Sequence, residues 1–262
     1  MFFLLRFFVL FFLIFSLQCC SSNTNSESNI IQNARTAFLT GENIAAENFY
    51  KNYLKDFPNG EYRLEAWERI YDITVNLRKD KVNALPLLDA MLLEYANDKK
   101  LLPQIIQKLA NLCSDLFQHE KSIELWIKYI ELEILTDSQR NLARLQLSKE
   151  YLLLKNFDLA LQVLRMCIDD KDSEGVFSSC QIQEAQVLFR MNQYDAAIFL
   201  LLSLRSNYPK QSNIYLDATF LLGDIFEILQ NKTKAIEMYE SILESYPNTR
   251  AVITRLNNLK LN

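Results

Sequence analysis

Residues 222–247, LGDIFEILQNKTKAIEMYESILESYP, are the stretch that decides the fold. Gly223 and Ala235 are small, so they allow two antiparallel helices to cross at close range. Tyr239 follows Ala235 by four residues and therefore lies on the same helix face, where it fills the space beside the crossing. Pro247 cannot continue a helical hydrogen-bond ladder and ends the second helix. The stretch predicts a pair of packed helices joined by a short turn.

The same spacing returns along most of the chain. The positions equivalent to Ala235 lie 38, 37, 38, 38 and 38 residues apart, and toward the N-terminus they are Ala197, Ala160, Ser122, Ala84 and Ala46. Four residues after each comes a large apolar side chain: Leu201, Leu164, Trp126, Leu88 and Tyr50. Seven residues after each comes another: Leu204, Cys167, Tyr129, Met91 and Tyr53. This spacing marks one helix face. It predicts an all-α chain of six helix-pair repeats.

The last repeat, with Leu222-Gly223, Phe226, Ala235, Tyr239 and Pro247 at these intervals, resembles the tetratricopeptide repeat (TPR). The resemblance implies a right-handed solenoid of helix-turn-helix units over residues 30–250. Three repeats end in an aromatic residue and a proline: Phe57-Pro58, Tyr208-Pro209 and Tyr246-Pro247. Long repeats of this kind resemble the envelope TPR lipoproteins of Gram-negative bacteria, which include the D lipoprotein of the β-barrel assembly machine and the TPR partner of the Tol–Pal system.

The N-terminus reads as a targeting segment. Arg6 precedes an unbroken apolar run over residues 7–15, which is the layout of a secretory signal. The junction Leu17-Gln18-Cys19-Cys20 resembles that of a bacterial lipoprotein, which implies a signal peptide over residues 1–20 and lipidation of Cys20, with Cys19 as the alternative. An uncleaved N-terminal anchor and a plainly secreted protein are the other interpretations. Each places the body of the protein outside the cytoplasm.

The polar residues 21–29, SSNTNSESN, predict a flexible tether between the lipid and the repeats. Serine directly after the lipidated cysteine implies, by the same resemblance, the outer membrane and a periplasm-facing body. The charged residues 169–177 are the best hinge candidate. At the other end, residues 251–262 are predicted to form a short capping helix that covers the last repeat with Val252, Leu256 and Leu259.

The three cysteines beyond Cys20 do not form a disulfide framework by number or spacing. Cys113 and Cys167 fall at core-facing positions of the repeat, so the favoured interpretation is small buried apolar residues. A bridge between Cys167 and Cys180 is the alternative, and the sequence leaves it open.

Composition excludes most other function classes. The chain has 4 glycines in 262 residues, too few for phosphate-binding loops or dinucleotide folds, and a net charge of −4, which argues against nucleic-acid binding. It contains no nucleotide-binding, zinc-protease or nucleophile-elbow motif and one histidine, His119, which we interpret as a polar turn residue. Asp169, Asp170 and Asp172 are interpreted as a solvated loop. We expect no enzyme activity, metal, cofactor or small-molecule substrate.

The informative surface is the concave groove that the first helices of stacked repeats line. The resemblance places nine candidate partner-binding residues there: Arg35, Arg69, Asn111, Lys149, Gln186, Phe189, Arg190, Phe220 and Asp224. Further groove positions are Ile73, Gln107, Leu145, Leu152 and Glu227. Charges along such a groove set register, and Phe189 and Phe220 are predicted as apolar anchors for an extended or helical segment.

We therefore expect a lipid-anchored, periplasmic scaffold that binds protein partners in outer-membrane protein assembly. The alternatives are a coordination factor of the Tol–Pal or peptidoglycan systems and a pilotin-like escort of secretin subunits.

Overall fold

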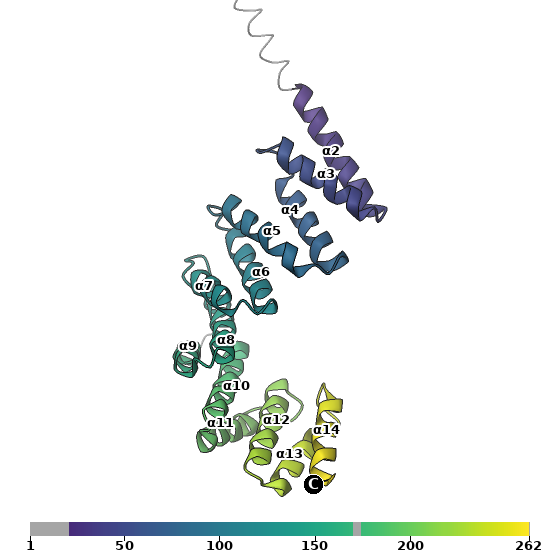
Figure 1. Cartoon of the computed structure of the whole chain (residues 1–262). Coiled ribbons are helices and arrows are strands. Elements are labelled where there is room, and N and C mark those ends of the chain that lie inside the picture. Colours follow the sequence, from purple (N-terminus) through teal and green to yellow (C-terminus); the bar gives the residue numbers. More distant parts are fainter. Residues whose placement is uncertain (1–20, 170–173, 262) are drawn as a thin grey trace, which may run out of the picture. The chain divides into compact units, whose positions relative to one another are not determined.

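The computed structural model describes residues 21–169 and 174–261, and all regular structure in these residues is helical. Six consecutive helix pairs are followed by one last helix (Figure 1). Their bounds are α2 (Ser21–Leu39) and α3 (Asn43–Asp56); α4 (Arg63–Asp72), extended by the π-helical turn η1 (Ile73–Leu77), and α5 (Lys81–Glu94); α6 (Leu101–Asp115) and α7 (His119–Ile130); α8 (Asp137–Leu153) and α9 (Phe157–Asp169); α10 (Glu174–Arg190) and α11 (Tyr194–Asn207); α12 (Asn213–Ile228) and α13 (Lys232–Ile242); and α14 (Thr249–Leu261). The six predicted repeats are confirmed.

The periodic small residues lie at the centre of each helix pair. Ala46, Ala84, Ser122, Ala160, Ala197 and Ala235 are all fully buried, each in the second helix of its pair. The predicted large residues four and seven positions later are also buried, from Tyr50 in α3 to Tyr239 in α13. Even the one polar member fits, because the Ser122 hydroxyl donates to the carbonyl oxygen of Ala110 at 3.0 Å. One repeating face therefore forms the core of every pair.

The chain divides into two compact units, residues 1–98 and 99–262. This division differs from the predicted hinge at 169–177. Residues 170–173 lie outside the described residues, and Glu174 begins α10. The helices on either side of that segment, α9 and α10, belong to one unit and are joined by a disulfide between Cys167 and Cys180. A covalent link across the segment opposes hinge motion there.

The Cys167–Cys180 bridge also corrects the favoured interpretation of these cysteines as unlinked core residues. Both are buried, as a core-facing position requires, but the stacking of α10 against α9 brings two sulfur atoms together that the sequence separates by 13 residues. Cys113 is buried and takes no part in a disulfide.

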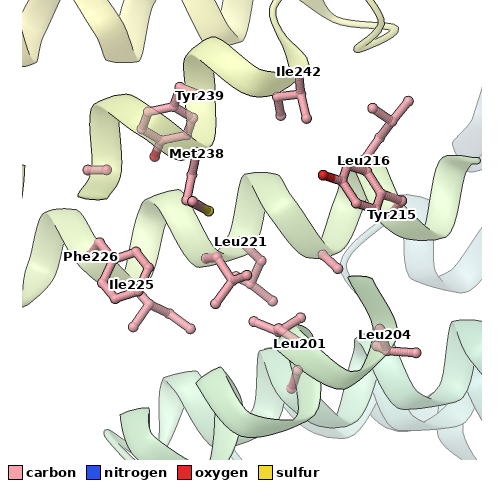
Figure 2. Close-up of a cluster of buried hydrophobic side chains, with 14 of the residues drawn as sticks. Leu201, Leu204, Tyr215, Leu216, Leu221, Ile225, Phe226, Met238, Tyr239 and Ile242 are labelled. Atoms are coloured by element: carbon pink, nitrogen blue, oxygen red, sulfur yellow. The ribbon is translucent and has the colours of Figure 1, made fainter. Parts of the chain in front are cut away.

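The core of the C-terminal end is built from five successive helices, α10 to α14, and Figure 2 labels its side chains from α11, α12 and α13. Leu201 and Leu204 come from α11, Leu221 and Ile225 from α12, and Tyr239 from α13. The same cluster contains Val252 and Leu256 of α14, with Leu259 packed against it. The predicted capping helix is therefore confirmed, although it begins two residues early, at Thr249.

Residues 21–29 do not form the predicted tether, because α2 begins at Ser21. The carboxylate of Glu27 ties this polar stretch of α2 to the rest of the fold. Its Oε1 accepts a hydrogen bond from the Tyr53 hydroxyl at 2.5 Å and another from the Glu61 backbone N–H at 3.1 Å. Both partners lie far along the sequence, so composition alone does not reveal them.

Within the described residues, no helix has the length and apolar character needed to cross a bilayer.

Candidate protein-binding groove

A pocket of about 430 Å³ opens along the first helices of the last three repeats. Its walls come from α8, α10, α12 and α14, and its lining residues are Leu152, Gln186, Phe189, Arg190, Leu221, Asp224, Glu227, Ile228 and Arg255. Six of these were predicted as groove positions from the sequence, all except Leu221, Ile228 and Arg255. The structure brings four of the nine predicted partner-binding residues together here: Gln186, Phe189, Arg190 and Asp224.

Carboxylates and a guanidinium form one network at the α12 side of this pocket. Tyr239 donates its hydroxyl hydrogen to Asp224 Oδ1 at 2.7 Å. Arg255 of α14 places Nη2 at 3.2 Å from the same oxygen and Nη1 at 3.4 Å from Glu227 Oε2. Burial, and then the hydrogen bond to Asp224, raises the pKa of the Tyr239 hydroxyl well above its usual range, so it stays a donor. Arg255 thus neutralises part of the acidic wall.

Three polar groups in the pocket remain without such partners among the described residues. The Oε1 atom of Glu227 is buried and accepts no hydrogen bond from any described residue. On the α10 side, neither the guanidinium of Arg190 nor the amide of Gln186 makes a hydrogen bond or ion pair within the described part of the chain. An unmatched buried acceptor and unmatched rim donors are what a surface offers to a polar ligand.

Phe189 is half-buried and belongs to the pocket wall, with its ring 6.0 Å from that of Tyr194. Phe220 has a different role from the one predicted. Its ring stacks on Tyr246 at 4.9 Å between centroids and meets Tyr239 edge-on at 5.5 Å. The aromatic residue of the Tyr246-Pro247 pair therefore covers Phe220, which packs into the core of the last repeat. Only Phe189 of the two predicted anchors lines the pocket.

A second pocket, of about 280 Å³, is lined by residues of α6, α7 and α8. The candidate Asn111 and the groove position Gln107 line it from α6. Gln139 and Gln146 line it from α8, and the remaining lining residues are Trp126, Tyr129, Leu142 and Ala143. Four side-chain amides thus surround a wall of aromatic and aliphatic carbon. Amides carry both donors and acceptors, so they can bind a main chain of any sequence.

Lys149 lies on the α8 face that serves both pockets. It is three residues from Gln146, which lines the second pocket, and three from Leu152, which lines the first. Its Nζ reaches Gln146 Oε1 at 3.4 Å and no carboxylate in the described residues. Although the side chain is exposed by surface area, the protein around its ammonium group lowers the Lys149 pKa by desolvation. This cation is thus partly stripped of water without a counter-charge.

Arg35 and Arg69 belong to the N-terminal unit and are described apart from these pockets. Arg35 forms a two-pronged ion pair with Glu65, Nε to Oε1 at 2.7 Å and Nη2 to Oε2 at 2.5 Å. That hydrogen-bonded pairing lowers the pKa of the Glu65 carboxyl. Arg69 is exposed and lies over the ring of Phe38 at 4.7 Å. Because Arg35 is already paired with Glu65, Arg35 is less suited to contact a partner than predicted.

Two further groove positions proved wrong. Ile73 and Leu145 are buried in the cores of their units, because each faces the second helix rather than the concave side. The lipidation candidates Cys20 and Cys19 and the loop residues Asp170 and Asp172 lie outside the described residues. In residues 21–169 and 174–261 no cluster of His, Cys, Asp and Glu could hold a metal ion.

His119 is not the solvated turn residue that the sequence indicated. It begins α7, and its Nδ1 lies 2.7 Å from Oε2 of Glu150, a residue of α8 that is 4% exposed. The imidazole ring of His119 therefore pairs with a buried carboxylate and links α7 to α8.

This architecture resembles a known repeat family and several solved structures. Residues 181–210 and 217–249 match the sequence model of the tetratricopeptide repeat. No curated protein sequence is significantly similar to the chain. Among solved structures, the TPR-like repeats of a kinesin light chain of Podosopora anserina share 14% identity and superpose with a TM-score of 0.58, covering 76% of this chain and all of that one.

Two further solved structures show a similar likeness in fold. BtubC from P. vanneervenii has 13% identity and a TM-score of 0.53, over 70% of this chain and 81% of its own. The MamA RS-1 double mutant has 15% identity and a TM-score of 0.53, over 71% of this chain and 94% of its own. At such identities the likeness concerns the fold. In its described residues the chain is all-helical and has the fold of a TPR solenoid, and its last two repeats match the sequence model of the tetratricopeptide repeat.

Proposed function

We propose that this protein is a lipid-anchored, non-catalytic scaffold that gathers protein partners in the bacterial cell envelope, at the outer membrane and facing the periplasm, during outer-membrane protein assembly. The observation that carries the proposal is the groove of the C-terminal unit. Its pocket of about 430 Å³ combines apolar walls with the unmatched polar groups of Gln186, Arg190 and Glu227. A pocket of this size accommodates a few side chains of an extended or helical segment.

The cysteines support a location outside the cytoplasm. Disulfides persist in oxidising compartments and are rare where thiols are kept reduced. The Cys167–Cys180 bridge thus agrees with the export signal predicted over residues 1–20. Lipidation at Cys20, or at Cys19, would hold the N-terminus of the solenoid at a membrane surface, so that its groove collects a partner near the place of use.

The pocket chemistry favours binding over catalysis. Arg255 pairs with both Asp224 and Glu227 and offsets one of their two negative charges, and Tyr239 is held as a hydrogen-bond donor. His119 is paired with Glu150. General acid–base catalysis needs a titratable side chain within hydrogen-bond reach of substrate, and the two carboxylates of the described pocket, Asp224 and Glu227, are both held by Arg255.

Cross-linking of the tagged protein in its native membranes, followed by mass spectrometry of co-purified proteins, tests the proposal. Wild-type protein is compared with a Gln186→Ala/Arg190→Ala groove variant and with a Phe199→Ala/Leu202→Ala control on the exposed side of α11. We expect barrel-assembly components with wild type and control and their loss from the groove variant. Recovery of Tol–Pal, peptidoglycan or secretin proteins instead would replace the assembly role, and equal recovery by all three would contradict binding in the groove.

The anchor is tested separately by cell fractionation. Cys20→Ser should release the protein from membranes, because the lipid is its attachment. Membrane retention of Cys20→Ser together with release of Cys19→Ser would move the lipid to Cys19. Retention of both variants and of the double variant would overturn lipid anchoring.

A further inference from the structure

The charges that line the C-terminal groove are not equally available to a partner. Asp224 and Glu227 both interact with Arg255, and Asp224 also accepts the hydrogen of Tyr239. Arg255 offsets one of the two carboxylate charges, which weakens the acidic wall as an attractor for a cation. Arg190 stands on the opposite wall and pairs with no described residue. Of the charged residues that line the described pocket, Arg190 is the one without an ion pair, and it is positive although the whole chain carries −4.

Lys149 extends this positive character along α8. It lies one helical turn from Leu152, a lining residue of the same pocket, and its hydrogen-bond partner is the neutral amide of Gln146. The depressed pKa of Lys149 reflects the same surroundings, since desolvation destabilises an ammonium that lacks a counter-ion. A carboxylate brought to this site would supply the counter-charge that the Lys149 ammonium lacks among the described residues.

The neutral groups beside these cations describe the rest of the occupant. Gln107, Asn111 and Gln186 make no hydrogen bond within the described residues, and amides of this kind can pair with peptide groups of a main chain. The buried Oε1 of Glu227 accepts nothing, and a neutral main-chain N–H suits it, because Arg255 already supplies the positive charge. Phe189, Leu152 and Leu221 offer an apolar contact.

We infer that the groove of the C-terminal unit binds an acidic protein segment, with carboxylates at Lys149 and Arg190, main chain along the side-chain amides and an apolar side chain against Phe189. The inference rests on the proposed function, since it assumes that this groove binds protein. A basic segment fits less well, because it would have to displace Arg255 and would approach Arg190 and Lys149 with like charge.

An array of random dodecapeptides, probed with the full-length protein in detergent, tests the inference. Bound peptides should be enriched in Asp and Glu over Lys and Arg, and binding of one selected acidic peptide, measured by fluorescence anisotropy, should weaken as salt rises. If no peptide binds, the groove is not a peptide site and the proposed function fails with the inference. If peptides bind without acidic enrichment, or with basic enrichment, the proposed function stands and the inference is overturned.

Charge variants identify the residues. Lys149→Gln/Arg190→Gln should weaken binding of the selected acidic peptide roughly tenfold, an effect within the range of two surface ion pairs. Lys128→Gln/Lys210→Gln is the charge-matched control, since both lysines are exposed and lie outside the pocket lining. We expect the control to bind as wild type does. Equal affinity of the groove variant and the wild type, with both folded by circular dichroism, would contradict the inference.

Discussion

Gly223 shows how one missing side chain sets the approach of two helices. A Cβ atom at this position would lie 2.5 Å from Cε1 and 2.7 Å from Cζ of Tyr239. The Tyr239 ring cannot move aside easily, because it is fully buried and Phe220 packs against it at 5.5 Å. The close crossing of α12 and α13 therefore depends on glycine at this residue.

Gly223→Ala should destabilise the protein. Alanine favours a helix over glycine by about 1 kcal/mol, whereas forced overpacking in a core costs about 1–3 kcal/mol. With contacts this short the steric cost should win, by about 1 kcal/mol in the free energy of unfolding, measured by urea denaturation. Combining it with Tyr239→Leu, which removes the ring, should make the glycine substitution neutral or favourable. An undiminished cost in the double variant would show that Tyr239 is not the obstacle.

His119 is expected to matter for stability. Its Nδ1 is the partner of a Glu150 carboxylate that is almost wholly buried, so His119→Ala would leave a charge without its hydrogen bond. We expect a loss of about 2–3 kcal/mol in the free energy of unfolding, the cost of stranding a buried charged acceptor. His119→Gln keeps a donor and should lose less. Equal losses for the two variants would contradict a role for the hydrogen bond.

At the scale of the element, the disulfide fastens α9 to α10 within the C-terminal unit. Cross-linking residues 13 apart restricts the unfolded chain, and for a loop of this length the expected stabilisation is about 3 kcal/mol. The Cys167→Ala/Cys180→Ala variant should lose about this amount, and reductant should destabilise the wild type without affecting the variant. A wild type that alkylating reagents label at Cys167 and Cys180 after unfolding without reductant would refute the bridge.

Elements were predictable from the sequence where local spacing carries the packing. Ala46, Ala84 and their successors mark every second helix, because a small residue is needed wherever two helices of a pair cross. The start of α2 was not predictable, since Glu27 is held by Tyr53 and Glu61 across 26 and 34 residues. The disulfide was not either, because it depends on how α10 stacks on α9.

The groove was predictable in part for the same reason. Gln186 and Asp224 sit at equivalent points of the repeat and Arg190 lies one helical turn after Gln186, so periodicity places all three on the concave side. The repeat period does not predict Arg255, because this residue belongs to the capping helix α14, which lies outside the period. Phe220 was misplaced because the ring of Tyr246 covers it, a contact that depends on the path of the chain after α13.

At the scale of the whole molecule, a solenoid of helix pairs carries a groove, and the proposed function adds a lipid anchor at its N-terminus. The solenoid gives the groove its form by repetition, and α14 closes the last repeat while Arg255 adjusts the charge of the pocket. The proposed scaffold function requires that protein partners contact this groove.

Site-specific photo-cross-linking in living cells tests that claim most directly. A photoreactive amino acid placed at Gln186, in the pocket wall, is compared with one at Phe199, whose side chain is 78% exposed on α11. The account predicts discrete cross-linked partner bands from position 186 and none of those bands from position 199. Identical bands from both positions, or bands from position 199 alone, would contradict the groove as the binding surface.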